Sequence, residues 1–160
     1  FKYLNIASII EPKTINDLKI MKFSDAPSRA RRILSDNSIV LSLVRPYHKS
    51  FVFIQDSKDI IASTGTGVVE IYDGTNTRFI FHQFFSKKFI SYCENRMSGT
   101  NYPAITPSDL EQYKIGLPKE NNVIEIESRR LDAIESIENE IKSKIQTSKI
   151  LQSAIINQIF

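Results

Sequence analysis

The stretch PSRARRILSDNSIVLSLVRPY (residues 27–47) combines the clearest strand signal of the chain with its densest run of arginines. Isoleucine, valine and leucine dominate residues 39–44, a composition typical of a buried or half-buried strand. An Asp-Asn-Ser segment at 36–38 favours a turn, and Pro46 ends the run because proline cannot donate to a sheet ladder. We therefore predict that residues 33–44 form the first strand region, around which the rest of the fold is built.

Basic residues stand at both ends of this region. Arg29, Arg31 and Arg32 precede it, and the sequence Arg-Pro-Tyr-His-Lys (residues 45–49) follows it. Burying an unpaired charge costs several kcal/mol, so three arginines within four residues cannot all be buried. At least some of them face solvent or an anionic partner, and a solvated basic turn fits the pattern as well as a binding surface does.

The composition describes one ordinary globular domain with room for an appendage. Of 160 residues, 41% are hydrophobic and 24% are charged, and no apolar run approaches the roughly 18 residues of a membrane span. The first residues lack the pattern of a secretory signal, and a lone cysteine, Cys93, fits a reducing compartment, so we expect a cytoplasmic protein. The chain begins with Phe1 rather than Met, and we expect a fragment or a trimmed product.

The charge is unevenly distributed. Residues 1–119 contain 16 basic and 11 acidic residues, a net +5, whereas residues 120–160 contain 5 and 7, a net −2. We predict a boundary between an electropositive body (1–119) and a mildly acidic tail (120–160) that have different partners.

Within the body the periodicity of the sequence predicts several short strands and one helix. Strands are expected at 51–54, 60–62 and 67–72, with weaker signals at 3–10, 20–23 and 115–117. Residues 78–97 are predicted to form one amphipathic helix, because an i, i+4 row of apolar side chains runs through them: Phe81, Phe85, Phe89, Cys93 and Met97. A second helix is expected to start at Thr106, which caps it, with Pro107 in its first position.

The tail contains neither glycine nor proline after residue 122, which predicts a helix of about ten turns. With Ile124 as position a of a heptad, seven of the eleven a and d positions are apolar, a pattern typical of a coiled-coil strand. The other six apolar positions are Leu131, Ile134, Ile141, Ile145, Ile155 and Ile159. Such a seam needs a partner, which is the body itself, a second copy of the chain or another helix.

No arrangement of residues indicates catalysis. The chain lacks a phosphate-binding glycine loop, and Gly65 and Gly67 form only a lone G-x-G. His48, His82 and Cys93 have no metal-ligand spacing. We therefore expect a non-catalytic chain without a cofactor of its own.

With no catalytic motif present, the feature that indicates a function is a basic body in which aromatic residues are interspersed with the charges. Nucleic-acid binding requires positive charge for the phosphates and polar groups that reach base edges. The candidate residues for these two tasks are Arg29, Arg31, Arg32, Arg45, Tyr47, His48, Lys49, Asn101 and Tyr102. Lys87, Lys88 and Arg96 add charge, although two lysines on a helix are more often a solvated face.

Three motifs in this order resemble the target recognition domain of Type I restriction–modification specificity subunits. They are PSRARRIL followed by VRPY (residues 27–34 and 44–47), ASTG (62–65), and the segment SGTNYPAI (98–105) that precedes IGLP (115–118). Leu43 stands where the family usually has threonine, and the segment of about thirty residues with which members usually open has no counterpart here. The resemblance covers almost the whole chain.

The resemblance implies an α+β fold, with a β-rich recognition domain and packed helices, followed by a long coiled-coil-forming C-terminal helix. It implies that the body reads one half of a bipartite site in double-stranded DNA. Ser63 and Thr64 join the candidate DNA contacts, because small residues at a strand end permit close approach of the backbone; a plain turn fits them equally well. Arg45 and Tyr47 fit a structural role as well as DNA contact. Methyltransferase subunits, which bind S-adenosylmethionine, would dock on this scaffold, and a restriction subunit is a further candidate partner.

Whole subunits of that family contain two recognition domains and two spacer helices, whereas this chain contains one of each. We therefore expect half a subunit that forms a homodimer through its terminal helix, or a truncated product. Two other interpretations stay open. One is the C-terminal recognition domain of a single-chain restriction–methyltransferase enzyme, and the other is a coiled-coil interaction protein without a DNA role.

Overall fold

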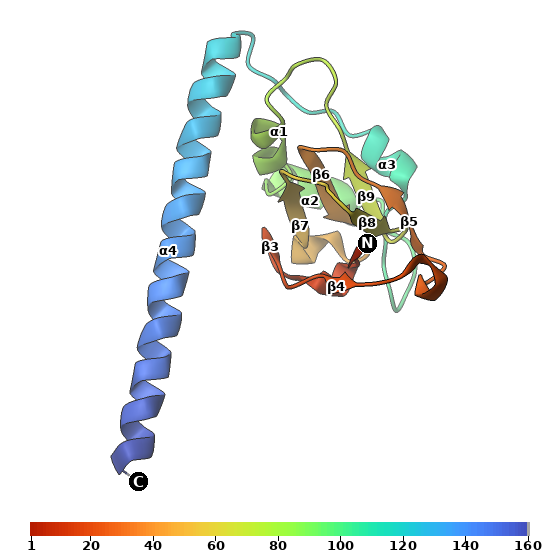
Figure 1. Cartoon of the computed structure of the whole chain (residues 1–160). Helices are drawn as coiled ribbons and strands as arrows, with labels where there is room; N and C mark the ends of the chain where they lie inside the picture. Colours follow the sequence, from red (N-terminus) through yellow and green to blue (C-terminus); the bar gives the residue numbers. More distant parts are fainter. Residues whose placement is uncertain (160) are drawn as a thin grey trace.

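The computed structural model describes residues 1–159, and it consists of a mixed α/β body (residues 1–119) with one long helix beside it (Figure 1). The strands are β1 (Lys2–Leu4), β2 (Ile9–Glu11), β3 (Thr14–Ile15), β4 (Lys19–Ile20), β5 (Ala30–Ile33), β6 (Ser38–Ser42), β7 (Phe51–Ile54), β8 (Ile60–Ser63) and β9 (Thr66–Val69). The α-helices are α1 (Thr77–Gln83), α2 (Lys87–Glu94), α3 (Pro107–Glu111) and α4 (Asn121–Ile159). Short 3₁₀ turns are η1 (Ile6–Ser8), η2 (Phe23–Asp25) and η3 (Pro46–His48).

β6 is the centre of the body and is buried along its whole length. It pairs antiparallel with β7 on one side and with β9 on the other, which makes a three-stranded sheet in the order β7-β6-β9. Ile39 and Leu41 enter one hydrophobic cluster, and Val40 enters a second cluster on the opposite face. Because both faces of β6 are covered, its middle is a continuous apolar run rather than an alternating one.

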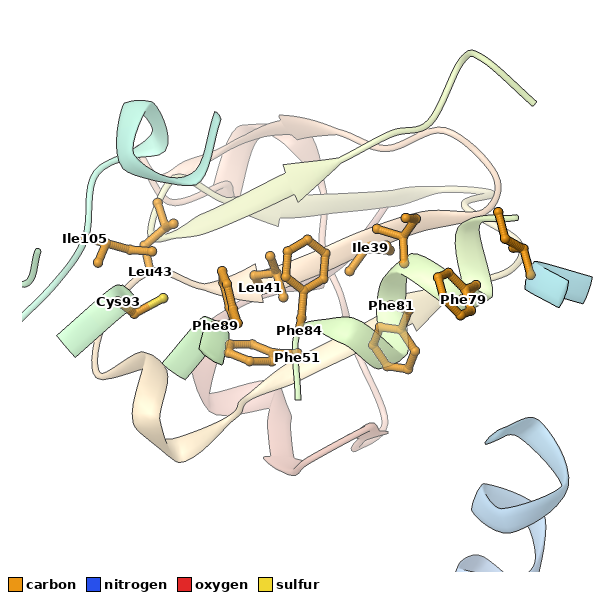
Figure 2. Close-up of a cluster of buried hydrophobic side chains, with 12 residues drawn as sticks. Ile39, Leu41, Leu43, Phe51, Phe79, Phe81, Phe84, Phe89, Cys93 and Ile105 are labelled. Carbon is orange, nitrogen blue, oxygen red and sulfur yellow. The ribbon is translucent and has the colours of Figure 1, made fainter. Parts of the chain in front are cut away.

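The first cluster fills the space between the three-stranded sheet and helices α1 and α2. Phe51 meets Phe89 edge-on at 5.9 Å between ring centroids, and Phe89 meets Phe84 at 4.7 Å (Figure 2). Each fully buried side chain of this size contributes about 1.5–3 kcal/mol, and edge-to-face pairs add to that contribution. These rings therefore fix the two helices on the sheet.

The second cluster joins the three-stranded sheet to a four-stranded sheet in the order β4-β1-β8-β5. Leu4 and Ala62 come from the four-stranded sheet, and Val40 and Val52 come from the three-stranded one. β1 runs parallel to β8 and antiparallel to β4. The chain passes directly from β8 to β9 and so from one sheet to the other, which brings the ends of several strands together at this turn.

The N-terminal part of helix α4 is docked on the body, and its C-terminal part is exposed. Ile124 and Ser128 are buried against the body, whereas residues 139–159 are all exposed, and the C-terminal end of α4 extends beyond the body in Figure 1. Of the predicted seam, Leu131 is half-buried, and the remaining isoleucines are about half exposed or more. Those exposed positions are Ile134, Ile141, Ile145, Ile155 and Ile159.

The prediction of one helix over residues 78–97 was wrong. The chain forms α1 and α2 instead, separated by a break at residues 84–86. The hydroxyl of Ser86 accepts a hydrogen bond from the backbone N–H of Phe89 at 3.2 Å and so caps α2. Serine favours an N-cap over a helix interior, and this local signal outweighs the apolar row that continues through it.

Two strand predictions also need correction. Residues 33–44 form two strands rather than one region, because Asn37 adopts a left-handed conformation (φ 60°) and turns the chain between β5 and β6. Arg31 and Arg32 accordingly lie in β5, whereas Arg29 lies in the turn that precedes this strand. Residues 115–117 form no strand in the structure, although the predicted cap of α3 by Thr106 is confirmed.

The predicted α+β fold class with a long C-terminal helix is confirmed. Among the described residues, no helix combines the length and the apolar character that crossing a membrane requires.

Candidate nucleic-acid interface

Backbone hydrogen bonds bring the ends of three strands together at one edge of the body. The N–H of Thr64 donates to the carbonyl of Arg29 at 2.9 Å, which ties the β8–β9 turn to the start of β5. The N–H of Leu43 donates to the carbonyl of Gly65 at 3.1 Å, which ties the same turn to the end of β6. Segments that are far apart in the sequence thus form one continuous edge.

Arg45 extends this edge to the loop at residues 98–104. Its N–H donates to the carbonyl of Pro103 at 2.8 Å, and its Nη2 donates to the carbonyl of Asn101 at 2.8 Å. Its guanidinium lies 5.2 Å from the ring centroid of Tyr102. Arg45 also has a left-handed backbone (φ 49°) at the entry to η3. The turn after β6 and the loop are therefore held in one conformation by Arg45.

The side chains at this edge are accessible. Arg29, Thr64 and Asn101 are exposed, and Tyr102 is 72% exposed. We call the five residues Arg29, Arg45, Thr64, Asn101 and Tyr102 the loop edge. Charged, amide and aromatic groups on a hydrogen-bonded scaffold are the set that binds phosphates and stacks on or hydrogen-bonds to bases.

Tyr47 and His48 lie in η3 next to the loop edge. Both are exposed, and their rings are 4.7 Å apart between centroids. Lys49 follows them but lines two hollows on another side of the body, one with Lys87 on α2 and one with Glu138 on α4. The structure thus separates Lys49 from the loop edge.

Ser63 is buried and is used by the fold itself. Its hydroxyl accepts from the N–H of Gly65 at 3.2 Å, and its carbonyl accepts from the hydroxyl of Thr66 at 2.7 Å. These bonds shape the β8–β9 turn that presents Thr64.

The three arginines near β5 point in different directions. Arg31 is exposed, and its Nε donates to the carbonyl of Ser28 at 3.0 Å. Arg32 pairs with the buried Ala62 across strands β5 and β8, and it lines a cavity of about 490 Å³ between β9 and α3. Its Nε is buried and has no hydrogen-bond partner among residues 1–159. Within β5 the alternation of half-buried and exposed positions therefore separates Arg32 from Arg31, while Arg29 lies before the strand.

Cys93 lies on the inner face of α2 and is fully buried. Burial raises the pKa of its thiol to about 12, which favours the protonated form over the reactive thiolate at neutral pH.

A second cluster of titratable residues joins α1 to α4, and it is the one group of described residues whose atoms approach metal-site geometry. Ligand atoms of His82, Asp132 and Glu135 lie within 4.8 Å of one another. Arg78 occupies the same space, with Nη2 at 2.7 Å from Asp132 and 3.1 Å from Glu135. The guanidinium of Arg78 and the ammonium of Lys13, which lies 3.2 Å from Glu135, together balance the charge of the two carboxylates, so this cluster does not fit a metal ion.

The sequence missed this cluster, because no local pattern links a histidine on one helix to carboxylates fifty residues away. Burial lowers the pKa of His82, and the hydrogen bond with Asp132 at 2.9 Å opposes that shift. The carboxyl pKa of Asp132 is lowered overall, because bonds from His82 and Arg78 outweigh the opposing effect of burial.

Comparison with known proteins yields a family and a set of structural relatives. The family described as Type I restriction modification DNA specificity domain matches residues 7–147. A structure reported under the subject of complex assembly and conformational transition of the type I R-M system superposes with a TM-score of 0.76 at 26% identity. The HsdS subunit from Thermoanaerobacter tengcongensis superposes with a TM-score of 0.68 at 26% identity.

The two alignments cover 93% and 88% of this chain, but only 39% and 37% of the relatives. The chain thus spans less than half the length of the solved proteins that it resembles. No curated protein sequence matches it.

Proposed function

This chain belongs to the Type I restriction modification DNA specificity domain family, and from that premise we propose that its body reads one half of a bipartite site in double-stranded DNA. The loop edge carries this proposal. Arg45 is fixed by two hydrogen bonds to the loop that presents Asn101 and Tyr102, so the groups that face the DNA are held rigid before binding. Preorganised polar groups discriminate between bases better than mobile ones do.

The division of roles within the loop edge follows from its chemistry. Arg29 is our candidate phosphate contact, because it is exposed and long enough to follow the DNA backbone. Asn101 and Tyr102 are our candidates for base contacts, because an amide can pair with adenine and an aromatic ring can stack. We assign Tyr47 and His48 to the flank of the same surface, and Arg31 to a more distant phosphate.

Helix α4 is proposed to hold two recognition bodies at a fixed distance. Its 39 residues span roughly 58 Å at 1.5 Å per residue, which exceeds one turn of B-DNA, about 34–36 Å. The exposed isoleucines form a stripe that would pair with a second such helix, either from another copy of this chain or from another recognition domain of a longer subunit. A rigid helix sets a separation that a flexible linker could not.

The chemistry of the system is assigned to partner subunits. In this proposal the chain positions methyltransferase subunits, which bind S-adenosylmethionine, and itself remains non-catalytic. The alternative of a single-chain restriction–methyltransferase assigns the same role to this part of the protein.

Charge reversal at the loop edge tests the proposal. We expect Arg29→Glu and Arg45→Glu each to weaken binding of a fluorescent DNA duplex at least about tenfold and to reduce its salt dependence. Lys58→Glu is the matched control, because Lys58 is an exposed cation at the opposite end of β8. If all three variants bind like the parent chain, the DNA role fails and a coiled-coil interaction protein becomes the better explanation.

A further inference from the structure

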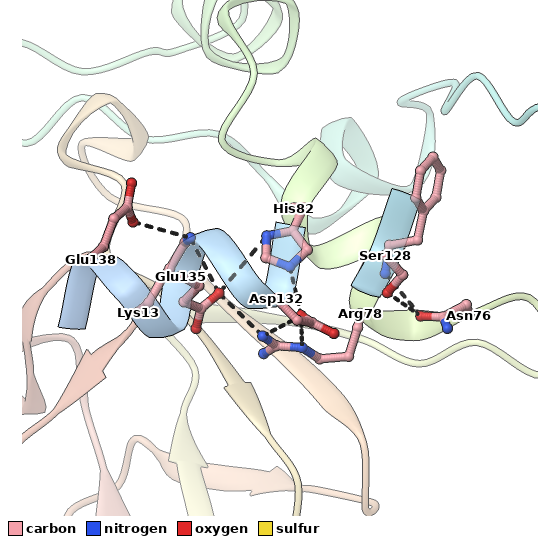
Figure 3. Close-up of polar contacts among 9 residues, drawn as sticks. Lys13, Asn76, Arg78, His82, Ser128, Asp132, Glu135 and Glu138 are labelled. Carbon is pink, nitrogen blue, oxygen red and sulfur yellow. Dashed lines mark hydrogen bonds and ion pairs between the residues drawn. The ribbon is translucent and has the colours of Figure 1, made fainter. Parts of the chain in front are cut away.

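The face by which α4 docks on the body is mainly polar. Ile124 is its buried apolar residue, and after it the contacts come from Ser128, Asp132 and Glu135, one on each successive turn (Figure 3). A helix held mainly by burial would show an apolar stripe on this face. Here the isoleucine stripe lies roughly a quarter to a third of a turn away and stays exposed.

Arg78 on α1 is the centre of the contact. Its Nε donates to Asp132 Oδ1 at 2.8 Å, and its Nη2 donates to Glu135 Oε2 at 3.1 Å. Lys13, from the turn between β2 and β3, reaches the same Oε2 of Glu135 at 3.2 Å. His82 adds a hydrogen bond to Asp132 at 2.9 Å. Three separate groups of the body thus converge on two carboxylates of α4.

Asn76 connects the start of α1 to the same face of α4. Its Oδ1 caps α1 by accepting from the N–H of Phe79 at 3.0 Å, and it also accepts from the hydroxyl of Ser128 at 3.1 Å. Its Nδ2 donates to Glu125 at 3.1 Å. The residue that starts α1 therefore also fixes α4.

These contacts are partly shielded and geometrically specific. The side chain of Glu135 is 14% exposed, so its pairs are screened less by salt than surface pairs are. Arg78 also lies 4.9 Å above the ring of Phe53 and 5.3 Å above that of Phe81, which fixes its position on the aromatic core. A directional pair of this kind permits one orientation, whereas apolar contact tolerates sliding.

The orientation of α4 has a large effect at its far end. Lys142 is the last residue of α4 that lines a hollow with the body. The 17 residues after it (143–159) extend about 25 Å further, so a tilt of roughly 10° moves the end of the helix by about 4 Å. That displacement exceeds the spacing of one DNA base pair, about 3.4 Å. A small error in docking would therefore change which half-site separation the assembled protein fits.

We propose that the polar latch between body and helix (Lys13, Asn76, Arg78 and His82 with Ser128, Asp132 and Glu135) determines the specificity for half-site spacing, although it lies away from the loop edge. This inference rests on the proposed function. It assigns spacing to a set of side-chain contacts, and leaves base recognition to the loop edge.

The direct test measures the angle of α4 in the full chain without DNA. Spin labels on Lys58→Cys and Ser153→Cys, both exposed sites, report the distance between body and helix, and the native thiol of Cys93 is too buried to react. We expect one narrow distance distribution in the parent chain. Asp132→Asn with Glu135→Gln should broaden or shift it, with an undocked population that rises about tenfold for each pair lost.

A matched pair of substitutions controls for the change in net charge. Glu127→Gln with Glu140→Gln also removes two carboxylates from α4, but these pair within the helix with Arg130 and Lys144. We expect this variant to keep the narrow distribution. Arg78→Gln tests the latch from the body side. Adding it to Asp132→Asn with Glu135→Gln should have little further effect, because Arg78 pairs with both of these carboxylates and its contacts are already lost. An unchanged distribution in all latch variants overturns the proposal.

DNA binding separates failure of the latch from failure of the function. Duplexes with two half-sites at varied separations should show a preferred spacing for the parent chain and a flattened profile for the latch variants, with affinity for a single half-site unchanged. If latch variants keep the spacing preference, this inference is wrong while the proposed function stands. If the parent chain binds no half-site at all, the proposed function itself has failed.

Discussion

At the scale of single residues, the contacts of Arg45 distinguish between the two roles that its sequence context leaves open. The motif Arg-Pro-Tyr fits a structural turn as well as a DNA contact. In the structure Arg45 locks the loop that carries Asn101 and Tyr102, which supports a positioning role.

We predict that Arg45→Lys keeps the charge but loses sequence preference, because an ammonium cannot reproduce the guanidinium contacts with Asn101 and Tyr102. The ratio of affinities for a preferred and a scrambled duplex should fall about tenfold or more, while non-specific affinity stays the same. Arg29→Lys is the control, and its ratio should stay unchanged if Arg29 contacts phosphate. Equal effects of the two substitutions would contradict this assignment.

Gly67 provides a second residue-scale prediction. A Cβ atom at this position would lie 2.7 Å from Leu110 Cδ2 and 3.0 Å from Leu43 Cδ2, so an added methyl group crowds the contact between β9 and α3. We expect Gly67→Ala to reduce the free energy of unfolding by about 1–3 kcal/mol in urea titration. Gly116→Ala, where nothing lies within 4 Å, should change it little, and the same loss in both variants would refute the packing argument.

The sequence predicted the loop edge in part. Arg29, Arg45, Asn101 and Tyr102 were candidates on charge and loop position, and the structure brings them together. It could not show that Arg32 turns inward, because the register of β5 against β8 depends on tertiary pairing. Nor could it show that Ser63 is used within the turn, since a small residue at a strand end fits both roles equally.

At the scale of elements, the helices show where periodicity succeeds and where it fails. The long α4 was predictable from the lack of glycine and proline, because no tertiary contact has to be known. The row from Phe81 to Met97 suggested one helix, and the cap at Ser86 divides it in two. The docking role of the polar face of α4 was not predictable, because its partners Arg78 and His82 lie on a helix about fifty residues away in the sequence.

The pH dependence of stability follows from His82. Burial, Lys13 and Arg78 lower its pKa, whereas Asp132 and Glu135 raise it, and the net shift is downward from 6.5. The unfolded chain therefore takes up a proton as the pH falls below about 6.5, while the folded chain resists it, so acidification destabilises the fold.

We expect the free energy of unfolding to decrease between about pH 7.5 and about pH 5.5, and His82→Gln to reduce that dependence. Urea titration at the two pH values measures it. His48→Gln, at an exposed histidine, is the control and should keep the parent slope. An identical slope in all three proteins would show that His82 does not titrate in this range.

The exposed stripe of α4 supplies a prediction about self-association. Ile134→Glu with Ile141→Glu should convert an assembled form to the 18.3 kDa chain in light scattering, because charge at the seam opposes helix pairing. Ser136→Glu with Ser143→Glu adds the same charge at exposed positions on another face of α4 and should leave the mass unchanged. An unaltered mass in the isoleucine variant would remove the coiled-coil claim.

At the scale of the whole molecule, the body with the proposed DNA-binding surface and the helix proposed to set the half-site separation form one connected unit. Backbone hydrogen bonds between three strand ends fix the loop edge, and the polar latch holds α4 against α1. By sequence the body has a net charge of +5 and the tail a net charge of −2. Such a unit suits a protein that selects DNA by two properties, the bases of a half-site and the distance to the next one.

The most direct test of this account is selection of bound duplexes from a randomised DNA pool by the full chain, alone and with a methyltransferase subunit present. We predict enrichment of one short motif, and its loss when Arg45 is replaced by lysine. Recovery of no motif under either condition would contradict the central claim that this chain recognises a DNA sequence.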